Sequence, residues 1–245
     1  MSDGQASLLS VLILARNEAE NLRTLLPDLQ AVLEAAGVAY EAIVVDADSP
    51  DGTSDAAVRA GATVVQQTMP GYANALRQGL AMCRGDRVLT VDADLSHRPE
   101  FVGELLAALD DADIAIASRY VPGGSADMPG SRRFLSWVMN RTFALALGLQ
   151  VRDLSSGYRV YRKTVLDRIE PQGAHFDVLP EIVAQAALAG FRVVEVPFHY
   201  HPREAGISKA RVLHFAPSYV RTLFRCMIRR AARASDRAAP AAKRS

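Results

Sequence analysis

Two aspartates separated by one residue follow a strand-like run near the middle of the chain. Asp92 and Asp94 come directly after residues 87–91, and Ser96 follows closely. Side chains at positions i and i+2 of an extended backbone point to the same side, so both carboxylates can face one cation. Hard oxygen ligands suit Mg²⁺ or Mn²⁺, which proteins usually share with substrate phosphates. The pattern predicts such a metal site, although Asp94 or Ser96 could instead cap a helix entered at Pro99.

A second acidic segment follows another apolar run, residues 42–46. Asp46 ends that run, and the polar residues 48–53 have the composition of a tight turn. A carboxylate here could accept hydrogen bonds from a base or ribose, as in other nucleotide-binding sheets. Ser49, Asp51 and Thr53 are equally typical of turns and helix caps. Both interpretations can hold for different members of the segment.

Charged residues at two further places are candidates for binding a nucleotide or a phosphate. Arg16, Asn17 and Glu18 follow the first apolar run, where Asn17 could instead cap a helix. In the second half, arginines on loops could bind phosphate through two hydrogen bonds, or could belong to an ordinary solvated surface. The basic residues of the second half are Arg119, Arg132, Arg133, Arg203, Lys209 and Arg211.

The spacing of the His, Cys and Ser residues indicates neither a zinc site nor the serine nucleophile of a hydrolase. His97 lies beside the acidic pair, and His199 and His201 flank the end of a strand-like run. No His–Cys or His-x-x-x-His spacing is present, however. The Ser-Ser-Gly sequence at 155–157 lacks the pattern of a nucleophile elbow. We therefore expect neither class of site.

The elements that must position these residues alternate between apolar runs and amphipathic stretches. We predict strands at residues 8–15, 42–46, 62–66, 87–91 and 113–117, separated by helices at 18–36, 55–60, 73–84 and 100–109. Nearly continuous Val, Ile, Leu and Ala are typical of strands buried on both faces of a parallel sheet. The order predicts an α/β fold with a doubly wound, mostly parallel sheet and helices on both faces. Ligands of such sheets bind beyond the carboxyl ends of the strands.

The second half of the chain has a different pattern. We predict a Gly- and Pro-rich loop at 119–131, a helix at 132–147, a strand at 158–161, a helix at 178–189 and a strand pair at 192–200. A basic amphipathic helix follows a polar loop, and from Arg211 onward there are nine Lys or Arg residues and one acid, Asp236. Such a helix can lie on an anionic membrane, or pack on the domain with its basic face exposed. We divide the chain into a main domain over 1–210, this helix over 211–233 and a disordered tail over 234–245.

Length and composition narrow the class of protein. A chain of 245 residues with 49% hydrophobic and 22% charged residues suits one globular domain with a small appendage. Cys83 and Cys226 form no metal or disulfide pattern, so we expect a reducing cytoplasm. Residues 1–7 lack the basic region of a signal peptide, and the apolar run at 8–15 is far shorter than the ~20 residues of a membrane span. Because basic residues gather only near the C-terminus, we expect no nucleic-acid partner.

Taken in order, the motifs resemble those of the inverting family-two glycosyltransferases, which share the GT-A fold. They are still more similar to those of polyprenyl (dolichyl) phosphate mannosyl- and glucosyltransferases. The matching residues are Arg16-Asn17-Glu18 with Asn21; Asp46 with Asp51-Gly52-Thr53; Gly71, Ala75 and Gly79; Asp92-Ala93-Asp94-Leu95-Ser96-His97 with Pro99-Glu100; Ser118-Arg119-Tyr120 with Gly123-Gly124; Ser131-Arg132, Ser136 and Asn140; Asp153 with Ser156-Gly157-Tyr158-Arg159; Glu195-Val196-Pro197; and Arg203, Gly206 and Ser208-Lys209.

The resemblance implies how a nucleotide-sugar donor would be bound. Residues 16–18 and Asp46 would contact the nucleotide. Asp92 and Asp94 would hold Mg²⁺ or Mn²⁺ against the diphosphate, with Asp94 as a catalytic group. The family usually has two acids after the second strand, but the second is Ala47 here. This departure leaves the identity of the base open.

The resemblance also implies a phosphate acceptor. Arg119, Arg132 and Ser136 would bind the acceptor phosphate, with Arg119 as a second catalytic group, and Arg203 and Lys209 would close over donor diphosphate and acceptor. A lipid phosphate is largely ionised near neutral pH, its second pKa being about 6, so it needs no strong general base. A sugar hydroxyl as acceptor would need a positioned carboxylate.

We therefore expect a metal-dependent enzyme that transfers a hexose, with mannose from GDP-mannose as first choice, to polyprenyl phosphate. It would act in the cytoplasm, peripherally on the cytoplasmic membrane face, through the helix at 211–233. The alternatives are a UDP-glucose or UDP-N-acetylhexosamine donor, or a non-lipid acceptor. A sugar nucleotidyltransferase should have a Gly-rich loop after the first strand, where residues 14–19 contain no glycine. A non-catalytic binding domain would not need the intact acidic pair.

Overall fold

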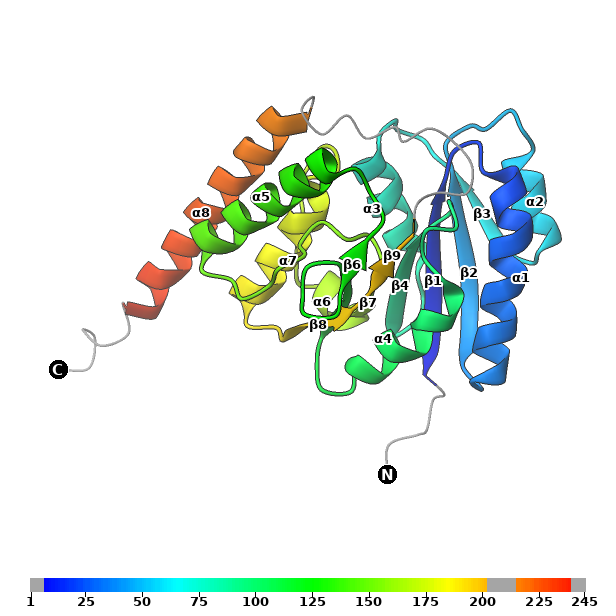
Figure 1. The fold of residues 1–245 in the computed structure, drawn as a ribbon, viewed down its shortest axis with the longest axis horizontal. Helices are drawn as coiled ribbons and strands as arrows, with labels where there is room; N and C mark the ends of the chain where they lie inside the picture. Colours follow the sequence, from blue (N-terminus) through cyan, green and yellow to red (C-terminus); the bar gives the residue numbers. More distant parts are fainter. Residues whose placement is uncertain (1–6, 202–214, 239–245) are drawn as a thin grey trace.

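Seven strands form the central sheet of the computed structural model, which describes residues 7–201 and 215–238 (Figure 1). Their order is β3-β2-β1-β4-β7-β5-β8, and all are parallel except β7, which runs antiparallel to β4 and β5. The strands are β1 (Leu8–Ala15), β2 (Ala39–Asp46), β3 (Thr63–Gln66), β4 (Arg87–Asp92), β5 (Ile114–Ser118), β7 (Arg159–Arg162) and β8 (Val193–Pro197). The predicted α/β fold with a mostly parallel sheet is confirmed.

The structure differs from the prediction mainly after β5. The predicted strand pair at 192–200 is divided between two sheets. β8 joins the central sheet, whereas β9 (His199–Tyr200) pairs in parallel with β6 (Ser125–Ala126), inside the predicted loop. Pro197 is tolerated at the end of the edge strand β8, because the pairing with Ser118 uses the Phe198 N–H (2.9 Å) and needs no N–H at position 197. The short α6 (Lys163–Leu166) is absent from the prediction, since four residues carry no helical periodicity.

Helices cover both faces of the sheet (Figure 1). One face packs against α1 (Ala19–Ala35), α2 (Thr53–Arg59) and α4 (Val102–Ala108), which follows the 3-10 turn η1 (Pro99–Phe101). The other packs against α3 (Tyr72–Met82), α5 (Gly130–Leu147) and α7 (Val178–Ala189). β1 supplies both cores, because Val11 and Ile13 face α1 while Leu12 faces α3.

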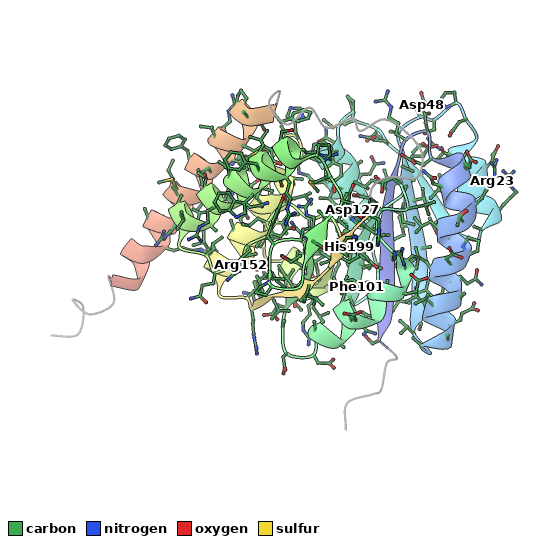
Figure 2. The ribbon with its side chains drawn as sticks, viewed as in Figure 1. Arg23, Asp48, Phe101, Asp127, Arg152 and His199 are labelled. Carbon is green, nitrogen blue, oxygen red and sulfur yellow. The ribbon has the colours of Figure 1, made fainter. Side chains whose placement is uncertain are left out.

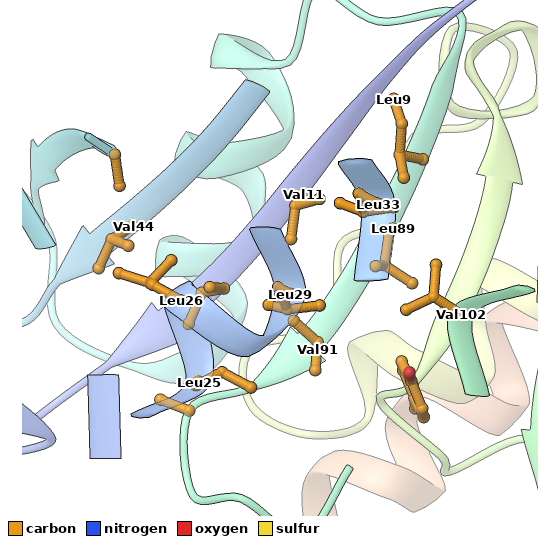
Figure 3. Packing of buried hydrophobic residues seen from close by; sticks show 14 of the residues in the cluster. Leu9, Val11, Leu25, Leu26, Leu29, Leu33, Val44, Leu89, Val91 and Val102 are labelled. Carbon is orange, nitrogen blue, oxygen red and sulfur yellow. The ribbon is translucent and has the colours of Figure 1, made fainter. Parts of the chain in front are cut away.

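Leucine spacing determines which side of α1 is buried. The inward face of the helix carries Leu22, Leu25, Leu26, Leu29 and Leu33, which recur at three- to four-residue intervals; all but Leu22 are labelled in Figure 3. Full burial of one such side chain stabilises the fold by about 1.5–3 kcal/mol. Packing on β1, β2 and β4, more than helix propensity, therefore holds α1.

The C-terminal helix α8 (Ala216–Ala238) lies beside α5 and α7 (Figure 1). Thr222 Oγ1 donates to Asp177 Oδ2 over 2.6 Å, and Arg225 Nε lies 3.2 Å from Glu181 Oε1. Both acids are fully buried, so these contacts join the helix to the domain. The helix continues into the predicted disordered tail as far as Ala238, whereas residues 211–214 and 239–245 lie outside the described part. No helix of the described chain is long and apolar enough to cross a membrane.

Candidate functional site

The carboxyl ends of three neighbouring strands bring the predicted donor residues to one edge of the sheet. Ala15 of β1 is in register with Asp46 of β2, and Leu14 is in register with Asp92 of β4. A cavity of about 640 Å³ opens at this edge and extends to α5, α7 and Tyr219 of α8. The predicted site residues on its wall are Arg16, Glu18, Asp92, Asp94, Arg119, Arg132 and Ser136.

The acidic pair forms a turn rather than a helix cap. Asp94 is buried, and its Oδ1 accepts hydrogen bonds from the Ser96 backbone N–H (3.1 Å) and hydroxyl (2.5 Å). The following 3-10 turn has Arg98 at its N-cap position, without a side-chain capping bond. The capping alternative is therefore wrong. The Asp92 side chain is 38% exposed and faces the cavity.

His97 supports Asp92 from the buried side. The backbone N–H of Asp92 donates to His97 Nδ1 over 3.1 Å, and Nε2 lies 3.8 Å from Asp92 Oδ2. Because Nδ1 accepts, the neutral ring carries its proton on Nε2, toward the carboxylate. Tyr158 stacks on the ring at a centroid distance of 4.7 Å. The imidazole is thus held in one orientation against the acidic turn.

Gly157 leaves space beside the Asp92 carboxylate. A Cβ atom at this position would lie 3.4 Å from Asp92 Oδ1 and 3.6 Å from Oδ2. Glycine therefore keeps both oxygens approachable from the β7 side. An i, i+2 pair of carboxylates, one of which is partly exposed to the cavity, suits a hard cation with several oxygen ligands.

The nucleotide end of the cavity differs from the prediction at two positions. Asp46 is 1% exposed, and its two oxygens accept hydrogen bonds from the Ser49 and Ser54 hydroxyls, each at 2.5 Å. Asn17 does not cap α1, and its backbone N–H donates to Ser49 Oγ over 2.8 Å. Neither Asp46 nor Asn17 lines the cavity, because both organise the turn beneath it.

Asp48 is the acid on the cavity wall that sequence reasoning missed. It is exposed, has a φ of 54° and lies at the upper edge of the molecule (Figure 2). Asp46-Ala47-Asp48, at the end of β2, repeats the Asp-Ala-Asp spacing of residues 92–94 at the end of β4, and β1 lies between these two strands. That repeat could have identified Asp48 from the sequence alone.

Arg119 is held by a buried carboxylate. Its Nε and Nη2 donate to Asp153 Oδ2 and Oδ1, both over 2.8 Å, and Nη2 also donates to Ser155 Oγ. Burial opposes the charge on the guanidinium, but Asp153 outweighs burial and raises the pKa of Arg119 further. Burial likewise opposes ionisation of Asp153, and Arg119 keeps the pKa of that carboxyl below its ordinary value. Asp153 thus holds the charged guanidinium of Arg119 on the cavity wall.

Helix α5 supplies the remaining predicted acceptor residues. Ser136 and Arg132 occupy its first half and line the cavity. The Asn140 amide donates to Ser155 Oγ over 2.9 Å and accepts from the Leu154 backbone N–H, also over 2.9 Å. Asn140 thereby fixes α5 against the loop that carries Asp153. Arg203 and Lys209 lie outside the described residues.

Part of the cavity is apolar, which no pattern in the sequence predicts. Its wall there is formed by Met128, Met139, Phe143, Phe176 and Tyr219. These residues come from the β6–α5 loop, α5, the segment before α7, and α8. Their distance in sequence explains why no local pattern groups them. An acidic region, a basic region and an apolar region therefore share one cavity.

Several known proteins are similar to this chain in sequence. The sequence model of glycosyl transferase family 2 matches residues 10–170. A dolichol-phosphate mannosyltransferase of Pyrococcus furiosus is 35% identical over 227 residues, which are 89% of this chain and 63% of that protein. An undecaprenyl-phosphate mannosyltransferase of Micrococcus luteus is 38% identical over 210 residues, covering 79% and 83%. This chain thus spans less than two thirds of the length of the Pyrococcus protein.

Solved structures support the fold assignment. Glucosyl-3-phosphoglycerate synthase of Mycobacterium tuberculosis, solved with Mn²⁺, UDP-glucose and phosphoglyceric acid, matches with a TM-score of 0.72. The match covers 91% of this chain and 81% of that one, at 20% sequence identity, so the likeness is one of fold. Together with the extent of the family match, these findings show that the chain belongs to glycosyl transferase family 2 and has the GT-A fold.

Proposed function

We propose that the chain transfers mannose from GDP-mannose to a polyprenyl phosphate, with inversion at the anomeric carbon. The two mannosyltransferase relatives support the sugar and the class of acceptor. The observation that carries the proposal is that one cavity is lined by the carboxylates of the sheet edge, by Arg119 and by apolar side chains. A donor diphosphate with its metal, an acceptor phosphate and a lipid tail need these three kinds of surroundings.

Asp92 and Asp94 would hold Mg²⁺ or Mn²⁺. The exposure of Asp92 to the cavity and the hard oxygen donors of the two side chains fit such an ion. When bound, the ion would neutralise the charge that grows on the departing nucleoside diphosphate. His97 would keep the Asp92 backbone and carboxylate in place, as side chains beyond the ligands do in other metal sites. Arg16, Glu18 and Asp48 would contact the nucleotide.

Arg119, Arg132 and Ser136 would bind the acceptor phosphate. Arg119 is already oriented by Asp153, and no hydrogen bond within the described residues uses its Nη1. Asp153 itself is fully buried and occupied by Arg119, which makes it unsuitable as a general base for a sugar hydroxyl. A phosphate acceptor, ionised before it binds, requires no such base. This contrast favours a lipid phosphate over a hydroxyl acceptor.

The outer face of α8 would contact the membrane. Val220, Phe224, Met227 and Ile228 are exposed there, among the arginines of the helix. Large apolar side chains beside basic ones are typical of helices at anionic lipid surfaces. We place the enzyme peripherally on the cytoplasmic face, where the polyprenyl phosphate could enter the cavity between α5 and α8.

A donor panel tests the reaction. The full chain is incubated with polyprenyl phosphate vesicles and radiolabelled GDP-mannose, UDP-glucose or UDP-N-acetylglucosamine, with Mn²⁺ or with EDTA. We expect lipid-extractable label from GDP-mannose only, and none in EDTA. Product from a UDP-sugar would show that GDP-mannose is not the donor. Equal amounts of product in EDTA and in Mn²⁺ would show that the reaction needs no metal. Release of pyrophosphate from a nucleoside triphosphate and a sugar phosphate would instead identify a nucleotidyltransferase.

A further inference from the structure

The short sheet of β6 and β9 has two unlike faces. Ser125 is in register with His199, and Ala126 with Tyr200. Side chains alternate along strands, so Ala126 and Tyr200 share one face; Ala126 is buried there, and Tyr200 lines the cavity. The opposite face must carry the residues at the alternate positions, which are Ser125, Asp127, His199 and His201.

Three of these side chains converge. His199 Nε2 lies 2.9 Å from Asp127 Oδ2, and His201 Nδ1 lies 3.9 Å from the same oxygen. One ligand atom from each of the three residues lies within 4.8 Å of the other two. The Asp127 backbone N–H donates to the Tyr200 carbonyl over 2.9 Å and extends the pairing of β6 with β9. Figure 2 shows Asp127 and His199 side by side.

The separations suit a transition metal. Two ligands of a tetrahedral Zn²⁺ lie about 3.3 Å apart, given metal–nitrogen distances of about 2.0–2.1 Å, and the observed 2.9 and 3.9 Å bracket this value. Two imidazoles and one carboxylate favour Zn²⁺ over Mg²⁺, which prefers oxygen ligands alone. Ser125 Oγ bonds His199 Nδ1 and so fixes the ring with Nε2 toward Asp127, as a supporting partner of a ligating histidine does.

We propose that Asp127, His199 and His201 form a zinc site separate from the Asp92–Asp94 pair. His201 is the last described residue before the segment that contains Arg203, and Asp127 lies in the connection from β5 to α5. A bound ion would therefore join these two connections on the side of β9 opposite Tyr200. Among the residues that the structure describes, these three form the one group of three or more His, Cys, Asp or Glu side chains whose ligand atoms lie close enough to bind a single ion.

Zinc binding to the full chain, produced without a polyhistidine tag, tests the proposal. The parent protein carries Asp92→Asn and Asp94→Asn, and excess Mg²⁺ is present, so that the acidic turn does not contribute. Titration against a chromogenic zinc chelator should give one Zn²⁺ per chain. His199→Asn and His201→Asn should each weaken binding by about 100-fold or more, since loss of a supporting group alone costs 10–100-fold. His175→Asn, at an exposed histidine elsewhere, should bind as the parent does.

The visible absorption spectrum of the Co²⁺-bound protein provides an independent test. A four-coordinate site with nitrogen ligands should give visible absorption bands that are lost in the His201→Asn protein. Circular dichroism without metal checks that this protein is folded, and Asp127→Asn provides the same test if it is not. Equal zinc affinity in the parent and in folded His199→Asn, His201→Asn or Asp127→Asn proteins would overturn the proposal. So would the absence of stoichiometric binding in the parent.

Discussion

Arg119 can carry its charge in a largely buried position because Asp153 accepts two parallel hydrogen bonds from it. Loss of one partner from a buried ion pair typically costs 3–5 kcal/mol, since the other charge stays behind without compensation. Asp153 is the fully buried member and Arg119 retains 13% exposure, so the lower end of that range applies. The guanidinium is consequently a fixed part of the cavity wall.

We predict that Asp153→Asn lowers the free energy of unfolding by about 3 kcal/mol, measured by urea denaturation. Asp113→Asn, at a half-exposed pair with Arg162, should cost less than about 1 kcal/mol. The pKa of Asp153 is lower in the folded protein, so the stabilisation is present above the ordinary Asp pKa of about 3.9 and is lost as pH falls toward the lowered value. Equal losses in the two variants at pH 7 would contradict this account.

Substitution of Asp94 should reduce turnover more than it reduces the stability of the fold. Asn at this position keeps an oxygen for the Ser96 hydrogen bonds but removes the negative charge. We expect Asp94→Asn to reduce kcat/KM by on the order of 10²–10³-fold, as for other groups that stabilise developing charge. Circular dichroism should be unchanged, and Ser96→Ala, which removes the bond but keeps the carboxylate, should lose far less activity. An unfolded Asp94→Asn protein would indicate a structural role.

At the scale of elements, α8 has two faces with different tasks. Its inner face places Thr222 and Arg225 against the buried acids Asp177 and Glu181, with Cys226 fully buried between α8 and the domain. Its outer face exposes Phe224 at 60% and Ile228 at 69%. A helix held by polar contacts on one side does not need those apolar side chains for its own packing.

We predict that Phe224→Glu with Ile228→Glu weakens binding to anionic vesicles at least tenfold. Burial of one such side chain is worth about 1.5–3 kcal/mol, or roughly tenfold or more in affinity. Vesicle sedimentation measures the effect. Val58→Glu, at a 61% exposed position on α2, is the matched control and should bind as the unmodified chain does. Undiminished sedimentation of the double variant would remove α8 from the membrane contact.

At the scale of the whole molecule, the sheet order brings together groups that are distant in sequence. β7 runs antiparallel between β4 and β5, and the loop before it carries Gly157 to the Asp92 carboxylate. The same loop carries Asp153 to Arg119 at the end of β5. One connection thus adjoins both the proposed metal site and the proposed acceptor site.

Gly157→Ala should reduce the apparent affinity for Mn²⁺ and lower kcat/KM at least tenfold, because the added methyl group would be in van der Waals contact with Asp92 Oδ1 at 3.4 Å and would occupy volume beside the proposed metal ligand. Mn²⁺ dependence of turnover measures this effect, with thermal unfolding as a check on the fold. Gly103→Ala on α4 meets no atom within 4 Å and should instead stabilise the helix by up to about 1 kcal/mol without changing activity. An unaltered Mn²⁺ dependence in Gly157→Ala would show that the space is not needed.

The strands of the first half could be predicted because their evidence is local. Apolar runs ending in Asp46 and Asp92 have the length and composition of buried parallel strands, and the βαβα order places their ends together. The order of residues along the chain was also enough to identify the acidic pair and the basic loop residues. It was enough to show the resemblance to glycosyltransferases. The roles of individual positions were harder to predict, as Asp46 and Asn17 show.

Contacts between distant segments determined the rest. No periodicity in the sequence joins Asp153 to Arg119, groups the apolar part of the cavity, or pairs two-residue strands across more than seventy positions. These arrangements depend on side-chain packing and on where each buried polar group finds a partner, and both are properties of the folded chain. Local composition therefore predicted the sheet and the chemistry at its edge. The folded structure decided that Asp48 lines the cavity while Asp46 holds the turn beneath it, because Asp46 is the carboxylate that accepts the hydrogen bonds of the Ser49 and Ser54 hydroxyls.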